Sequence, residues 1–69
     1  MKALLFGERL RELRLEKNLT QKQLGDIFNV NRVTIVDWEI RGKQPSYEIL
    51  CKLAKFFEVS SDYLLGLED

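Results

Sequence analysis

The segment from residue 32 to residue 40 carries the side chains whose types and spacing could do chemistry. Helical spacing of apolar residues places Ile35 and Trp38 on an inner face, so the residues between them face outward. The outward residues are Arg32, Val33, Val36, Asp37 and Ile40. A guanidinium fits the O6 and N7 atoms of guanine, a valine packs on thymine methyl groups, and a carboxylate accepts from the amino group of cytosine. This face therefore favours the reading of base edges in DNA.

The rest of the residue inventory argues against an enzyme. The chain has no histidine and one cysteine, Cys51, so it lacks the commonest general base near neutral pH and any Cys/His set for zinc. A chain of 69 residues also rarely encloses a substrate pocket of roughly a few hundred cubic ångströms. We therefore expect no catalysis, metal, cofactor or small-molecule ligand. We interpret Cys51 as a small, partly buried hydrophobic residue.

No segment has the features of a membrane span or an export signal. The longest apolar run, residues 3–6, is far shorter than a span, and no small-residue cleavage site follows it. A single cysteine also cannot form a disulfide within the chain. These features favour a cytoplasmic protein without a membrane partner.

The elements that position these side chains are all helices. The length, with 45% hydrophobic and 32% charged residues, predicts a single globular domain over residues 1–69. Apolar spacings of three and four predict helices over residues 3–17, 21–28, 32–40, 46–57 and 61–66. Capping residues mark four of the starts: Thr20 with Gln23 in a capping box, then Asn31, Ser46 and Ser60.

The second and third helices are separated only by residues 29–31, so they must cross steeply. Gly25 supplies a small residue where the two helices approach, and Asn29 tolerates the left-handed conformation that the reversal needs. The inward residues of the unit are Leu24, Phe28, Val30, Ile35 and Trp38. This pattern predicts a helix-turn-helix at residues 21–40, with the second helix in the major groove.

Motifs along nearly the whole chain resemble the lambda-repressor/Cro-type helix-turn-helix domains, also called the XRE family. The matching stretches are L-R-E-L-R at 10–14, L-T-Q-K-Q-L at 19–24, I-x-x-W-E at 35–39, G-K-Q-P-S at 42–46 and L-x-K-L-A-K-F-F-x-V-S-S-D-Y-L-L-G at 50–66. The resemblance implies a five-helix domain that binds operator DNA, usually as a dimer, and regulates transcription in bacteria or phages. The chain departs from the family pattern at Gly25, where alanine is usual.

The resemblance also implies residue roles. Gln21 matches a residue that meets phosphate, Arg14 and Glu39 match an ion pair, and residues 32–34, 36 and 37 match DNA-facing positions. Basic residues near the helix ends add possible phosphate contacts. The expected DNA contacts are Arg11, Gln21, Lys22, Asn31, Arg32, Val33, Thr34, Val36, Asp37, Arg41 and Lys43. Asp37 would be repelled by phosphate unless it accepts from cytosine.

Several of these features have a second interpretation. Trp38 has the spacing of a core residue more than that of a base-stacking platform. The strip of Val33, Val36 and Ile40 could bind a protein instead of DNA, as in an antitoxin that neutralises a partner. Tyr63, Leu65 and Leu67 exceed what one thin core can bury, which predicts a dimer contact through the helix at residues 61–67.

The net charge of zero conceals an uneven distribution. Residues 1–44 hold nine basic and six acidic side chains, a net of +3, whereas residues 45–69 hold two basic and five acidic, a net of −3. We therefore expect a homodimeric regulator, acting as a repressor by occlusion of a near-palindromic operator. Modest positivity predicts weak non-specific binding. If the chain is complete, its regulation must come through concentration, a partner or competition at the operator.

Overall fold

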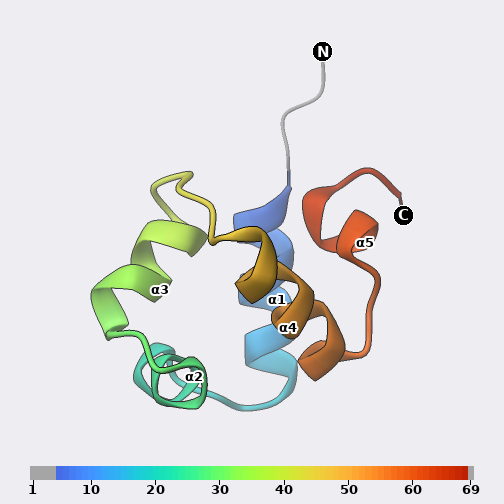
Figure 1. The fold of residues 1–69 in the computed structure, drawn as a ribbon. Coiled ribbons are helices and arrows are strands. Elements are labelled where there is room, and N and C mark those ends of the chain that lie inside the picture. Colours follow the sequence, from blue (N-terminus) through green and yellow to red (C-terminus); the bar gives the residue numbers. More distant parts are fainter. Residues whose placement is uncertain (1–4, 69) are drawn as a thin grey trace.

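The computed structural model describes residues 5–68, and these fold into five helices with no strand among them (Figure 1). The helices are α1 (Phe6–Glu16), α2 (Gln21–Phe28), α3 (Arg32–Glu39), α4 (Tyr47–Phe57) and α5 (Ser61–Leu65). In Figure 1, α2 and α3 lie to one side of α1, and α5 lies to the other side. The predicted all-α, five-helix architecture is confirmed. None of the described helices is both long and apolar enough to cross a membrane.

The four predicted capping residues all begin helices. Thr20 Oγ1 accepts a hydrogen bond from the Gln23 backbone N–H at 3.0 Å, and Gln23 Oε1 accepts from the Thr20 N–H at 2.8 Å, which completes the capping box. The side chains of Asn31, Ser46 and Ser60 each accept from the backbone N–H three residues later. Each cap satisfies a backbone donor that the helix itself leaves without a partner.

The first helix begins later than predicted. It starts at Phe6, whereas the predicted start at residue 3 lies outside the described residues, and Leu5 is already non-helical, with φ −104° and ψ 16°. Leu5 offers no side-chain oxygen to cap the first turn. Helix α1 also ends at Glu16, one residue early. Three other predicted ends differ by one residue. Ile40, Ser46 and Gly66 were expected inside helices, but they are the cap residues that flank α3, α4 and α5.

All five helices contribute to one buried core. Its described members are Phe6, Leu10, Leu24, Ile35, Trp38, Leu50, Leu53, Ala54, Phe57 and Leu64. Trp38 is 6% exposed, which confirms its interpretation as a core residue. Cys51 is partly buried, as predicted. Phe56 packs edge-on against Phe28, with ring centroids 5.6 Å apart, and so joins α2 to α4. Burial of these side chains supplies the main favourable free energy of folding.

Candidate nucleic-acid interface

The turn between α2 and α3 is built as its sequence predicted. Asn29 adopts the left-handed conformation, with φ 59° and ψ 38°, and the Val30 N–H donates to the Gly25 carbonyl at 2.9 Å. A Cβ atom at position 25 would lie 2.6 Å from the Val30 carbonyl oxygen. Because atoms cannot approach so closely without displacement, glycine lets the turn pack directly on α2. The close contact reaches Asn31, which caps the start of α3.

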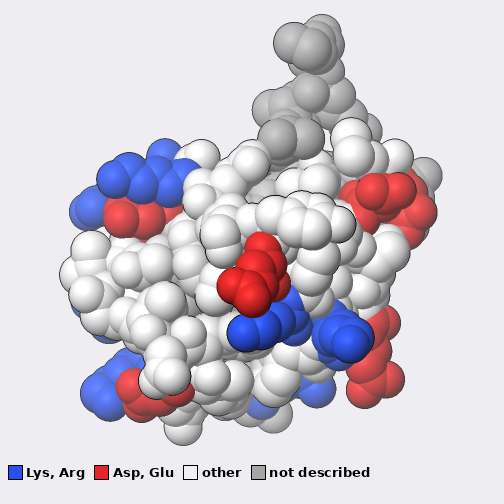
Figure 2. All heavy atoms as spheres, in the orientation of Figure 1, with Lys and Arg blue, Asp and Glu red and all other residues white. Residues whose placement is uncertain are grey.

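Helix α3 has one buried face and one exposed face. Ile35 is fully buried and anchors the helix beside Trp38. On the other face, Arg32 is exposed, Val33 is 55% exposed and Ile40 is 68% exposed, while Val36 is half-buried. Figure 2 shows a mostly uncharged surface along α3, with basic and acidic atoms side by side over the loop that follows it. The exposed face therefore presents apolar groups and one cation from the first turn.

A buried ion pair fixes the end of α3 against α1. Arg14 Nε donates to Glu39 Oε2 at 2.7 Å, and Arg14 Nη2 donates to Glu39 Oε1 at 3.1 Å. The third guanidinium nitrogen, Nη1, donates to the Leu19 carbonyl at 2.8 Å. The side chain of Arg14 is 8% exposed and that of Glu39 is fully buried. A two-point contact of this kind fixes orientation as well as distance.

The expected DNA contacts Gln21, Asn31 and Thr34 make hydrogen bonds that brace the starts of α2 and α3. The Gln21 amide donates to Glu39 Oε1 at 3.3 Å, so its side chain joins the buried ion pair. Asn31 Oδ1 accepts from both the backbone N–H and the hydroxyl of Thr34, at 2.9 and 3.0 Å. These bonds hold the N-terminal turns of α2 and α3 in place. The backbone N–H groups of those turns are the donors suited to phosphate.

Asp37 lies within a cationic cluster at the end of α3, which we define as Asp37, Arg41 and Lys43. Asp37 Oδ1 accepts from Arg41 Nη1 at 3.0 Å, and Asp37 Oδ2 lies 4.0 Å from Lys43 Nζ. The Asp37 backbone carbonyl accepts from the N–H groups of Arg41 and Lys43 at 3.2 and 3.1 Å. The structure thus brings these three predicted residues together.

The other two basic candidates lie on different helices. Lys22, on α2, is exposed and pairs with Asp26 at 3.1 Å, one helical turn away. Arg11 is exposed on α1. Neither belongs to the cationic cluster.

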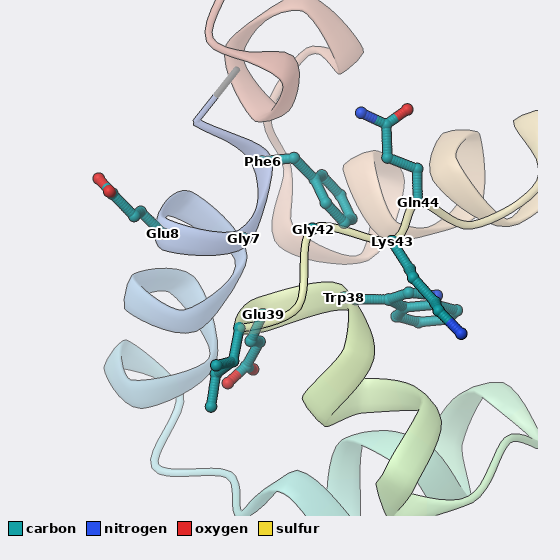
Figure 3. A pocket seen from close by; sticks show the side chains of 9 residues that line it. Phe6, Gly7, Glu8, Trp38, Glu39, Gly42, Lys43 and Gln44 are labelled. Atoms are coloured by element: carbon teal, nitrogen blue, oxygen red, sulfur yellow. The ribbon is translucent and has the colours of Figure 1, made fainter. Parts of the chain in front are cut away.

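A small pocket of about 210 Å³ opens where the first turn of α1 meets the end of α3 (Figure 3). Phe6, Trp38 and Gln44 contribute to its lining. Gly7 lies at the contact between the two helices, where a Cβ atom would be 2.5 Å from the Glu39 carbonyl oxygen. Sequence reasoning did not single out Gly7, because its partners lie more than thirty residues away along the chain.

The residues predicted to form a dimer contact differ in exposure. Leu67 is 66% exposed, whereas Leu65 is partly buried against the core. The Tyr63 ring lies under the Arg9 guanidinium, 4.2 Å from the ring centroid, and Arg9 also donates to the carbonyls of Tyr63 and Glu68. Sequence reasoning missed Arg9, which ties α1 to the end of α5.

Comparison with known proteins finds relatives across most of the chain. The transcriptional activator BcrR of Enterococcus faecalis is 44% identical over 64 residues, which is 93% of this chain and 31% of that protein. The repressor protein C2 of Salmonella phage P22 is 38% identical over 65 residues, covering 94% of this chain and 30% of that protein. The chain spans about a third to a little over half the length of the first curated relatives it matches.

The fold also matches a solved structure. The crystal structure of the P22 c2 repressor in complex with a synthetic operator aligns with a TM-score of 0.81 and 36% identity, covering 91% of this chain and 96% of that one. Residues 10–64 match the family described as Helix-turn-helix. The chain therefore belongs to the Helix-turn-helix family, and the predicted lambda-repressor/Cro type is confirmed.

Proposed function

We propose that this chain binds a specific site in double-stranded DNA through α3 and regulates transcription. The observation that carries the proposal is the exposed face of α3, which is anchored from behind by Ile35 and Trp38. The fold matches that of a repressor in complex with its operator, and the relatives are named as transcriptional regulators rather than enzymes. The chain would then act in the cytoplasm of a bacterium or of a phage-infected cell.

In this proposal, α3 supplies the base contacts. Arg32 donates a pair of hydrogen bonds to a guanine, and Val33 and Val36 pack on thymine methyl groups. The N-terminal turn of α2, with Gln21 and Lys22, contacts the phosphate backbone and sets the register of α3 in the groove. Arg11 extends this backbone contact along α1, and Asn31 and Thr34 keep the first turn of α3 in place.

We further propose that two copies bind together and repress by occlusion. Two-fold pairing would place the half-sites about 34 Å apart when they lie one helical turn of DNA apart, so the operator would be nearly palindromic. The exposed Leu67, with Tyr63 and Leu65, supplies the proposed dimer contact at α5. In Figure 1, α5 lies away from α3, which would leave the reading face open to DNA.

Binding-site selection from a random duplex library tests the proposal. We expect one enriched, near-palindromic motif, and Arg32→Ala should weaken binding to it by about 1–3 kcal/mol and relax the preference at one base pair. Lys52→Ala on α4 serves as the control and should leave the enriched motif unchanged. Sedimentation should show two copies per duplex.

Three outcomes would contradict part or all of the proposal. No enriched motif, together with no loss of binding on Arg32→Ala, would overturn the proposal. Tight co-purification of a protein partner through Val33 and Ile40, with weak DNA binding, would support an antitoxin-like interaction module instead. A monomer both in solution and on DNA would overturn only the dimer.

A further inference from the structure

We propose that Asp37 determines specificity by restraining Arg41 and Lys43, so that these cations do not grip the phosphates of unrelated DNA. The inference rests on the proposed function and names a role for the one carboxylate on the exposed face of α3. Direct reading of cytosine was the role open to Asp37 from the sequence alone. The geometry of the cationic cluster points to a different one.

The cluster is held by main-chain and side-chain bonds together. The Asp37 carbonyl accepts from two N–H groups of the following loop, which fixes the backbone of that loop beside the carboxylate. The carboxylate then holds the Arg41 guanidinium at 3.0 Å and lies 4.0 Å from the Lys43 ammonium. Both cations are therefore next to a negative charge before any DNA arrives.

The exposure of these side chains shows which of them can move. The Asp37 side chain is 18% exposed, whereas those of Arg41 and Lys43 are 61% and 72% exposed. The cations can swing toward a phosphate, but the carboxylate, which is largely buried, stays in place. By contrast, the Asp26 side chain that pairs with Lys22 is 67% exposed and can turn away with little constraint.

This arrangement weakens contact with any phosphate at the end of α3. A phosphate must draw a cation away from Asp37 and must also approach the carboxylate, which repels it. Non-specific binding depends almost wholly on such phosphate contacts, so this competition lowers the non-specific affinity. A specific complex also has base contacts, which are insensitive to this competition. A cost shared by both complexes would leave their affinity ratio unchanged. In the specific complex, base contacts instead hold α3 in a register in which Arg41 and Lys43 stay paired with Asp37, so Asp37 raises the ratio of specific to non-specific affinity.

The test compares Asp37→Asn with Glu58→Gln, which makes the same change in net charge at the α4–α5 turn, away from α3 in Figure 1. Each 69-residue protein is titrated with a duplex of fixed, scrambled sequence over a range of salt concentrations. One additional phosphate contact steepens the log–log salt dependence by about 0.9. Asp37→Asn should therefore bind the scrambled duplex roughly eightfold more tightly at 0.1 M salt, and the gain should vanish near 1 M salt. Glu58→Gln should leave the salt slope unchanged.

A double-mutant cycle assigns the effect to the restrained cation. Arg41→Gln should reduce the salt slope by about 0.9 in the Asp37→Asn background and by much less in the parent protein. Equal effects in both backgrounds would overturn the proposal, as would equal gains for Asp37→Asn and Glu58→Gln. Loss of preference at a single C·G pair, with the scrambled affinity unchanged, would show direct base reading instead. Circular dichroism confirms that each variant is folded.

Different results would contradict the proposed function and the role of Asp37. The scrambled-duplex titrations require no operator, so they test Asp37 even if selection enriches no motif. If a motif is enriched and Asp37→Asn changes neither the affinity for that motif nor the affinity for the scrambled duplex, the proposed function stands and the role of Asp37 is wrong.

Discussion

Removal of one partner from the Arg14–Glu39 pair should strongly destabilise the protein. The Arg14 side chain is 8% exposed and makes three hydrogen bonds within the chain, two of them to Glu39. Glu39→Ala leaves only the bond to the Leu19 carbonyl. An unpaired buried charge of this kind costs about 3–5 kcal/mol of the free energy of unfolding. A chain of this length has about 3–10 kcal/mol in total. The variant should therefore melt roughly 12–40 °C below the parent protein.

The exposed pair on α2 supplies a matched control. Lys22 and Asp26 are 3.1 Å apart, similar to the buried pair, but their side chains are 75% and 67% exposed. Asp26→Ala should cost less than about 1 kcal/mol, because water and salt screen the charges. Each variant thus removes the carboxylate from an ion pair, in one case buried with two hydrogen bonds and in the other exposed with one.

Thermal and urea unfolding followed by circular dichroism measures both variants. The replacement of both partners, Arg14→Met with Glu39→Leu, should recover much of the loss, since an apolar pair leaves no charge unpaired. Recovery should be incomplete, because the Leu19 carbonyl and the Gln21 amide lose their partners. The prediction would be refuted if Glu39→Ala cost no more than Asp26→Ala. It would also be refuted if the separate effects of Arg14→Met and Glu39→Leu simply added in the double variant.

Two backbone substitutions should act against their usual direction. Gly7→Ala should lower the melting temperature although alanine gains about 1 kcal/mol of helix propensity, because the new Cβ would lie 2.5 Å from the Glu39 carbonyl oxygen and 2.8 Å from that of Trp38; a melting temperature above the parent's would contradict the close approach. Glu58→Gly should raise the free energy of unfolding by at most about 1 kcal/mol, because Glu58 ends α4 in the left-handed conformation with φ 58°. Glu58→Ala, which relieves no strain, serves as the control, and equal melting temperatures for the two variants would show that backbone strain at Glu58 is not the cause.

Features governed by neighbours in the sequence could be predicted from the sequence. Thr20, Asn31, Ser46 and Ser60 bond to N–H groups three residues away, so capping chemistry alone located four helix starts. The α2–α3 turn could be predicted for the same reason, since Gly25 faces Val30, only five positions on, and the left-handed Asn29 lies between them. The start of α1 carries no such signal, because Leu5 at its N-cap offers no side-chain oxygen.

Features that join distant segments could not be predicted in the same way. Gly7 matters only because the end of α3 lies against it, and Arg9 only because the chain returns to α1 after α5. Arg14 and Glu39 were paired through the family resemblance, since 25 positions separate them. The spacing placed Asp37 on the exposed face, but it gave no indication that the following loop would fold back and bring Lys43 to the carboxylate.

The buried pair also connects stability to the reading of DNA. Arg14 comes from α1, the Leu19 carbonyl from the turn after it, Gln21 from the first turn of α2, and Glu39 from the end of α3. The cluster therefore fixes the first turn of α2, which we propose contacts phosphate, relative to the helix that we propose reads bases. Misplacement of catalytic or binding groups by about 1 Å lowers activity or affinity. A variant such as Glu39→Gln, which keeps the shape but weakens the charge-assisted bonds, should thus lose preference for its operator at temperatures where it is still folded.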